Sequence, residues 1–192
     1  MQGLYKIVFA TCNKKKFEEV KEILQEYNIE LERRDVKGLE IQSDELAPIA
    51  LFSAIQAYNQ VKREVIVEDS GLFIKSLKGF PGTYSSFVYR TLGLKGILKL
   101  MEGLEERSAY FLSSLGFCDG KEVKLFLGKV EGWVSYSERG DRGFGFDPIF
   151  IPEKLDKTFG ELSLEEKNKI SHRSRSVRQL AEWLKKYRQL TK

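Results

Sequence analysis

The chain has 192 residues, enough for one domain with a continuous core or for one domain divided into two lobes. Hydrophobic residues make up 42% of the chain and charged residues 31%, the balance of a globular protein with a highly charged surface. The net charge of +4 is compatible with small anionic ligands and is too small to require a polyanionic polymer as partner.

The cysteine and histidine content excludes a scaffold built on disulfides. Cys12 and Cys118 are the only cysteines and His172 is the only histidine, so a structural zinc site would need other ligands. No apolar run approaches the roughly 18 residues of a membrane span, and no charged-then-apolar leader opens the chain. We therefore expect a soluble, cytoplasmic protein without a membrane partner.

The first third of the chain alternates predicted strands and helices. Residues 5–10 are an apolar run suited to a buried strand, and residues 29–33 alternate like a second strand. Between them, Asn13 can cap an amphipathic helix. Ser43-Asp44 offers a cap for a second helix over residues 46–61.

The middle of the chain begins with another short buried strand, Val65-Ile66-Val67. This strand is predicted to deliver Glu68-Asp69-Ser70-Gly71 at its carboxyl end. A turn at residues 79–82 precedes a predicted helix over residues 94–104.

The pattern then changes to antiparallel strands. Residues 110–117 and 123–127 flank Asp119-Gly120, which is a strong hairpin signal. Residues 129–135 can supply a third strand.

The C-terminal part contains a glycine-rich loop before residue 148 and a capping box at Ser163-Leu164-Glu165-Glu166. Apolar residues at helical spacing over residues 177–187 predict a final amphipathic helix. Early strand–helix alternation followed by a hairpin predicts an α/β fold. We expect a single catalytic domain over residues 1–192, with a two-lobed mixed sheet flanked by helices and an active-site cleft between the lobes.

The segment Thr11-Cys12-Asn13-Lys14-Lys15-Lys16 lies between a predicted strand and a predicted helix. The first N–H groups of a helix are free and partly positive, so they bind phosphate readily. Thr11 and Asn13 can add hydroxyl and amide donors, and Lys16 adds a full charge. The glycines and the Gly-Lys-Ser/Thr ending of a Walker loop are missing. The alternative interpretation is a solvated lysine run at a helix start.

The acidic pair Glu68-Asp69 is predicted where open α/β sheets bind ligands, at the carboxyl end of a strand. Carboxylate oxygens are the ligands that Mg²⁺ prefers, and Glu40 could join the pair from another loop. Adjacent strand residues point to opposite faces, so only one of the pair need face the cleft unless the strand ends before them. The alternative is a pair of acidic turn residues.

Two later segments could contact a nucleobase. In Gly143-Phe144-Gly145-Phe146-Asp147-Pro148 the glycines allow close backbone approach, and Phe144 could stack on a flat ring. The alternative is an aromatic plug under a loop. The segment from Lys167 to Arg173 carries groups that could read a base edge or hold phosphate. The alternative there is the solvated face of a basic helix, with His172 structural or exposed.

Five motifs occur in a fixed order along the chain. They are Thr-x-Asn-x-x-Lys-x-x-Glu (11–19), Glu-Asp-Ser-Gly-Leu (68–72), Gly-x-Pro-Gly-x-Tyr-Ser (79–85), Gly-Phe-Gly-Phe-Asp-Pro-Ile-Phe (143–150) and Lys-x-x-Ile-Ser-His-Arg (167–173). Together they resemble the inosine triphosphate pyrophosphatase family, the house-cleaning enzymes for deaminated purine nucleotides, from residue 5 to about residue 185.

The resemblance implies hydrolysis of the triphosphates of inosine, deoxyinosine and xanthosine (ITP, dITP and XTP) to the monophosphate and pyrophosphate. It also implies a requirement for Mg²⁺, two α/β lobes around a long sheet, and a homodimer. No nucleic-acid partner is expected.

By the same resemblance, Glu40 and Asp69 coordinate the metal, with Glu68 as an alternative ligand. Asp69 also accepts a proton from the attacking water. The residues expected to contact substrate are Thr11, Cys12, Asn13, Lys14, Lys15, Lys16, Ser70, Phe144, Gly145, Phe146, Asp147, Lys167, His172 and Arg173.

The sequence departs from the family pattern at several positions. Cys12 and Phe146 stand where glycine and Tyr or Trp are common, respectively, and the arginine typical of bacterial members is absent after Tyr84-Ser85. A lysine often found before the acidic motif has no match between residues 49 and 61. The phosphate contact that this lysine makes in the family is therefore not assigned to any residue of this chain.

Base selection is predicted to involve Arg173, which could donate to the 6-keto oxygen of hypoxanthine or xanthine. Adenine would leave this donor unpaired, whereas rejection of guanine requires an unfavourable element near its 2-amino group. Two other functions fit the residues. One is a pyrophosphatase with a different base preference, and the other is a nucleic-acid-binding module based on the basic residues 172–178.

Overall fold

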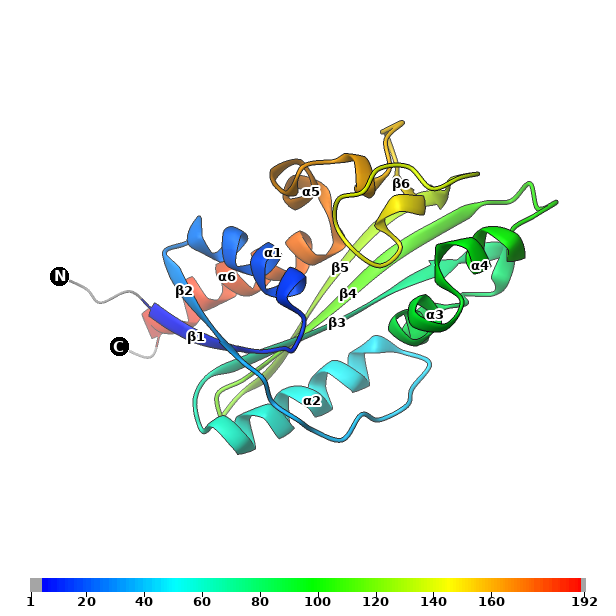
Figure 1. The fold of residues 1–192 in the computed structure, drawn as a ribbon. Coiled ribbons are helices and arrows are strands. Elements are labelled where there is room, and N and C mark those ends of the chain that lie inside the picture. Colours follow the sequence, from blue (N-terminus) through cyan, green and yellow to red (C-terminus); the bar gives the residue numbers. More distant parts are fainter. Residues whose placement is uncertain (1–4, 191–192) are drawn as a thin grey trace. The chain divides into compact units, whose positions relative to one another are not determined.

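The computed structural model describes residues 5–190 and contains one mixed six-stranded sheet with strand order β2-β1-β3-β4-β5-β6 (Figure 1). β1 pairs in parallel with β2 and β3, and β5 pairs antiparallel with β6. The strands are β1 (Tyr5–Ala10), β2 (Ile29–Arg34), β3 (Val65–Ile74), β4 (Ser108–Cys118), β5 (Val123–Val134) and β6 (Phe150–Pro152). The flanking helices are α1 (Lys14–Gln25), α2 (Leu46–Val61), α3 (Ser85–Thr91), α4 (Gly93–Leu100), α5 (Leu164–Ile170) and α6 (His172–Leu190). The predicted α/β class, a mixed sheet flanked by helices, is confirmed.

The chain folds as two compact units. The first comprises residues 1–69, 113–128 and 173–192, and the second comprises residues 70–112 and 129–172. The long strands β3, β4 and β5 contribute residues to both units. Among residues 5–190, no helix is long and apolar enough to span a membrane.

In the first unit, α1 and α6 lie side by side and pack against the sheet (Figure 1). The shared apolar cluster includes Ile23 of α1, Leu180 of α6 and Phe9 of β1, all fully buried. Burial of each such side chain contributes on the order of 1.5–3 kcal/mol. The amphipathic helix predicted near the C-terminus is therefore confirmed, and its apolar stripe covers this face of the sheet.

The helix α2 covers the opposite face of the same strands (Figure 1). Val8 packs with α2 whereas its neighbour Phe9 packs with α1 and α6, as strand alternation requires. α2 approaches β4 closely because Gly116 has no side chain; a Cβ atom there would lie 2.6 Å from the carbonyl oxygen of Ala50.

The predicted N-caps of α1 and α5 are present, whereas that of α2 is not. Asn13 caps α1, since its Oδ1 accepts the N–H of Lys16 at 3.0 Å. The capping box at Ser163 is also present. The predicted cap of α2 was wrong: the N-cap is Glu45, without a side-chain cap bond, and Ser43 Oγ accepts the N–H of Glu45 instead.

The acidic motif does not end its strand, contrary to the sequence prediction. β3 continues to Ile74, and Leu72 and Ile74 are fully buried in the core of the second unit. Gly71 is a close-packing position rather than a turn, because a Cβ atom there would lie 2.2 Å from the carbonyl oxygen of Gly82. Glu68 and Asp69 therefore lie inside a strand and must point to opposite faces.

The predicted hairpin is confirmed, and Asp119 closes its turn by accepting the N–H groups of Lys121 and Glu122. The prediction of a separate strand over residues 129–135 was wrong, because β5 continues without a break to Val134 with alternating burial. The helix expected over residues 94–104 ends at Leu100, and the left-handed φ of 74° at Gly103 is not helical.

Candidate active site

The start of α1, in the first unit, forms the loop predicted to bind phosphate. Thr11 Oγ1 accepts the N–H of Asn13 at 3.1 Å, which together with the Asn13 cap fixes the loop. Cys12, Lys14 and Lys15 are exposed. The loop therefore presents a cysteine, two lysines and a helix N-terminus to solvent, while the Thr11 hydroxyl hydrogen and the Asn13 amide can still donate.

Lys16 differs from its neighbours because its ammonium group is tied to the acidic motif. Its Nζ lies 3.0 Å from the main-chain oxygen of Glu68 and 3.0 Å from Glu68 Oε2. The Lys16 side chain is 16% exposed. An ammonium group carries three donors, and the bond to the Glu68 main-chain oxygen uses one of them, while the contact with Oε2 is an ion pair without hydrogen-bond geometry.

Glu68 is the centre of a buried charged cluster. Its side chain is fully buried, and Oε1 accepts the Ser113 hydroxyl at 2.8 Å and lies 3.2 Å from Arg173 Nε. Oε2 pairs with Lys16. Donors from α1, β4 and α6 therefore converge on one carboxylate, which would have to release some of them to ligate a metal ion.

Arg173 is held between two carboxylates. It is 1% exposed, and its guanidinium pairs with Glu19 of α1 as well as with Glu68. Burial by itself lowers the pKa of Arg173, but the Glu68 and Glu19 carboxylates more than offset this and raise the pKa above its usual value. The guanidinium stays charged, and the two cations Lys16 and Arg173 balance the two carboxylates.

Asp69 and Glu40 are the carboxylates predicted to hold a metal ion. Asp69 is half-buried and points to the face of β3 opposite Glu68. Glu40 is exposed and follows Leu39, whose backbone N–H and carbonyl both bond the side-chain amide of Gln56 on α2. The described residues contain no group of three or more His, Cys, Asp or Glu side chains that could hold a metal ion by themselves. Mg²⁺ is usually held by one or two carboxylates together with water and substrate phosphates, so each of these two carboxylates is a suitable type of ligand. Ser70 follows Asp69 and is half-buried.

In the second unit, the glycine-rich loop is organised by Asp147. Its Oδ2 accepts the N–H of Phe144 at 2.7 Å and lies 2.6 Å from Lys167 Nζ, with both charged side chains 3% exposed. Gly143 is required here, since its φ is 70° and a Cβ atom would lie 2.1 Å from Asp147 Oδ2. The loop is therefore a rigid hydrogen-bonded turn over a buried ion pair.

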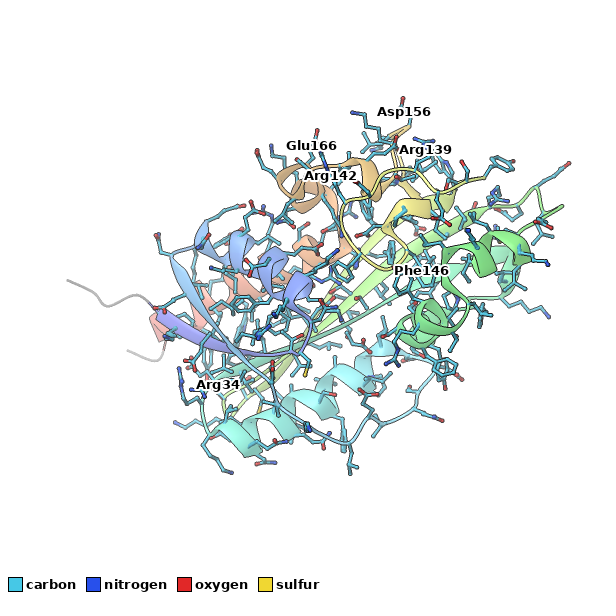
Figure 2. The ribbon with its side chains drawn as sticks, in the orientation of Figure 1. Arg34, Arg139, Arg142, Phe146, Asp156 and Glu166 are labelled. Atoms are coloured by element: carbon cyan, nitrogen blue, oxygen red, sulfur yellow. The ribbon has the colours of Figure 1, made fainter. Side chains whose placement is uncertain are left out.

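The two phenylalanines of this loop have different environments. Phe144 is half-buried, and its ring centroid lies 4.9 Å from Lys167 Nζ. Phe146, labelled in Figure 2, is 2% exposed. Its ring packs edge-on against Tyr89 of α3, with ring centroids 5.6 Å apart. Phe144 is thus the ring with a surface to offer a nucleobase, and Phe146 supports the loop from below.

The same loop is anchored to the segment that follows β6. Arg139 bonds Glu161 at 2.7 Å and also the main-chain oxygen of Asp156, near which it lies in Figure 2. The N–H of Arg142 bonds the carbonyl of Gly160 at 3.0 Å. These bonds restrict the loop before it reaches Phe144.

His172 is a core residue of the second unit. It is 2% exposed and its ring stacks on Phe111, with centroids 4.6 Å apart and planes 11° from parallel. Of the basic run 172–178, His172 and Arg173 are buried and Arg178 pairs with Glu26 at 2.6 Å. This arrangement weakens the nucleic-acid-binding alternative, which requires an exposed basic face.

Sequence reasoning did not select three residues of the Glu68 cluster. Glu19 closes the first motif but was not assigned a role in the site, although an acid on the apolar side of α1 signals a buried partner. Ser113 and Ser176, whose hydroxyls lie 2.9 Å apart, sit within otherwise ordinary strand and helix patterns. No local signal identifies them.

The second unit also has an open depression of about 510 Å³ beside α3 and α4. It is lined by Tyr89, Arg90, Leu92, Gly93, Leu94, Lys95 and Glu138. None of these lining residues belongs to the predicted site, although Tyr89 supports Phe146.

Comparison with known proteins agrees with the five motifs. The chain is 53% identical over 182 residues to the dITP/XTP pyrophosphatase of Saccharolobus solfataricus, covering 95% of each chain. It is 49% identical to the dITP/XTP pyrophosphatase of Hyperthermus butylicus, covering 94% of this chain and 95% of that protein. Among solved structures, a HAM1 protein from Coxiella burnetii matches with a TM-score of 0.84 at 29% identity, covering 95% of this chain and 99% of that one. The Ham1 protein of Staphylococcus aureus matches with a TM-score of 0.81 at 30% identity and the same coverage.

The family profile that matches this sequence extends over residues 7–183, nearly the whole chain, and confirms the resemblance inferred from the motifs. The chain belongs to the Ham1 family.

Proposed function

We propose that this protein hydrolyses deaminated purine nucleoside triphosphates, namely ITP, dITP and XTP, to the monophosphate and pyrophosphate, and so removes them from the nucleotide pool. The relatives that are about half identical over nearly their full length are dITP/XTP pyrophosphatases. The structural observation that carries the proposal is the position of the Lys16 ammonium group, which Glu68 holds beside the N-terminus of α1. Asp69 is the residue that follows Glu68 in the chain. This combination supplies the fixed positive charge and the carboxylate that phosphoanhydride hydrolysis needs.

The phosphate end of the substrate is assigned to the first unit. A remaining N–H of the Lys16 ammonium group donates to a phosphate oxygen, the N–H groups at the start of α1 add further donors, and the exposed Lys14 and Lys15 attract the triphosphate. Thr11, Cys12 and Asn13 shape this loop, and Ser70 contributes a substrate contact. Because Glu68 already holds the Lys16 ammonium group through a hydrogen bond and an ion pair, little ordering remains when the phosphate binds.

Glu40 and Asp69 would hold Mg²⁺. Bound Mg²⁺ neutralises charge on the phosphates and stabilises the leaving pyrophosphate. Asp69 also accepts the proton of the attacking water, a role for which a half-exposed carboxylate is accessible. Glu68 is assigned to positioning instead of metal binding, because its oxygens already serve Lys16, Ser113 and Arg173.

The base end is assigned to Phe144, Gly145, Phe146 and Asp147, with Lys167, His172 and Arg173. Phe144 stacks on the purine, while Asp147 and Lys167 fix the loop that carries it. The charged Arg173, held by Glu19 and Glu68, is the donor for the 6-keto oxygen. Adenine offers an amino group at that position and would leave the buried donor unsatisfied.

We further propose that residues 1–192 act as one catalytic domain in a cytoplasmic homodimer. The second unit exposes Phe80, Tyr84 and Phe87, which are 38%, 44% and 59% exposed, respectively, and a second copy could cover them. Light scattering with size-exclusion chromatography measures the assembly; a monomer of 22.2 kDa at micromolar concentration would reject the dimer.

The substrate class is tested by rates on a panel of nucleotides at a single Mg²⁺ concentration. Rates on ITP, dITP and XTP should exceed those on ATP and CTP by at least about a hundredfold, because a buried hydrogen-bond donor left unpaired costs up to about 3 kcal/mol. Equal rates on all triphosphates would reject the house-cleaning function and leave a pyrophosphatase without base preference, whereas a higher rate on an ordinary triphosphate would indicate a different base preference.

A further inference from the structure

We propose that Ser113 is a positioning residue for the pyrophosphatase reaction, because its hydroxyl fixes the Glu68 carboxylate so that this carboxylate holds Lys16 for the phosphates. The inference rests on the function proposed above. Ser113 lies on β4, is fully buried, and places Oγ 2.8 Å from Glu68 Oε1. Lys16 contacts the other oxygen of the same carboxylate, Oε2, at 3.0 Å.

The hydrogen count fixes the direction of these bonds. An ionised carboxylate only accepts, so the one hydroxyl hydrogen of Ser113 goes to Glu68. Ser176 Oγ lies 2.9 Å from Ser113 Oγ and 3.0 Å from the carbonyl oxygen of Arg173, and it can donate to either. Ser176 therefore supports Ser113 from α6. Of the two bonds that Ser113 makes, the charge-assisted bond to Glu68 is stronger than the bond to Ser176.

Loss of the Ser113 hydroxyl would change the contacts that hold the two oxygens of the Glu68 carboxylate. Oε1 is shared by Ser113 and the Arg173 guanidinium, whereas Oε2 serves Lys16. Without Ser113, Oε1 loses its shorter contact, and the carboxylate can rotate about its last bond toward Arg173. Rotation moves Oε2 away from Lys16 Nζ, which then keeps its bond to the Glu68 main-chain oxygen alone. A loosely held ammonium group stabilises developing charge on the phosphates less well.

The strand offers a matched control in the next residue. Ser114 is also fully buried in β4, but it points to the opposite face and its hydroxyl has no hydrogen-bond partner in the described part of the chain. Ser113→Ala and Ser114→Ala delete the same atom from the same strand. Only the first removes a bond to Glu68.

The test is steady-state hydrolysis of ITP with Mg²⁺ by Ser113→Ala, Ser113→Thr and Ser114→Ala, alongside thermal unfolding of each protein. We expect Ser113→Ala to lower kcat/KM by about tenfold, the scale of one hydrogen bond to a charged group. Ser113→Thr, which keeps the hydroxyl, should recover most of that loss, and Ser114→Ala should match the wild type. If Ser113→Ala does not fold, Ser113→Cys replaces it, since a thiol is a weak donor of similar size.

A double-mutant cycle separates positioning from general destabilisation. If Ser113 acts through Lys16, Ser113→Ala should cost less than about twofold when Lys16→Met is already present. An equal loss in both backgrounds, or equal losses for Ser113→Ala and Ser114→Ala, would overturn the inference. A wild-type protein that does not hydrolyse ITP would instead reject the proposed function.

Discussion

Lys16 Nζ lies 3.0 Å from both the main-chain oxygen and the carboxylate Oε2 of Glu68, so one acidic residue holds the ammonium group at two points. Two adjacent residues of β3 consequently have different roles. Glu68 faces the buried cluster, while Asp69 points the other way.

Asp69→Asn should lower turnover of ITP far more than it weakens nucleotide binding. The amide cannot take a proton from water, and a general base contributes about 10²- to 10⁴-fold to rate. Turnover is measured at saturating ITP and Mg²⁺, and affinity by calorimetry with a non-hydrolysable analogue. Near-normal turnover would remove Asp69 as the base.

Glu68→Gln should reduce both stability and activity. It removes one of two carboxylates that face the buried cations, and loss of one partner of a buried ion pair costs about 3–5 kcal/mol. Denaturant unfolding measures the stability loss. A variant as stable as the wild type would show that the cluster does not depend on the Glu68 charge.

Lys167→Met should destabilise the loop that carries Phe144. Asp147 would remain buried without its 2.6 Å partner, at a cost of about 3 kcal/mol. Lys169→Met on the same helix is the control, because its 2.7 Å pair with Glu165 is exposed, and its unfolding midpoint should be unchanged. Similar losses for the two variants would argue against a special role for the buried pair.

Alkylation of Cys12 should inhibit hydrolysis, and ITP with Mg²⁺ should protect against it. Cys12 is exposed in the proposed phosphate loop, whereas Cys118 is buried, so a small reagent discriminates between the two thiols. Cys12→Ser should keep activity and resist the reagent. Inhibition of Cys12→Ser, or absence of protection by ITP, would place the phosphate elsewhere.

Features set by neighbouring residues were predictable from the sequence. The Asn13 cap and the Ser163 capping box depend on residues three positions apart, and both are present. Strand alternation also separates Glu68 from Asp69, because neighbouring residues of a strand point to opposite faces of the sheet. The motif order identified the family because it samples nearly the whole chain.

Features set by distant contacts were not predictable. Ser70-Gly71 has the composition of a turn, yet β3 continues through it to Ile74, and Gly71 lies where a side chain would clash with the carbonyl of Gly82. Arg173 pairs with Glu19 across 154 residues of sequence, and Ser113 reaches Glu68 across 45. Periodicity within one element carries no information about such partners.

Cleavage between the α- and β-phosphates with Mg²⁺ is tested most directly by product analysis of ITP hydrolysis. Purified protein is incubated with ITP and Mg²⁺, and the products are separated by ion-exchange chromatography, with a parallel reaction in excess chelator. The predicted result is formation of inosine monophosphate and pyrophosphate in equal amounts. Neither product should form when the metal is removed. Inosine diphosphate with orthophosphate as the primary product would contradict it.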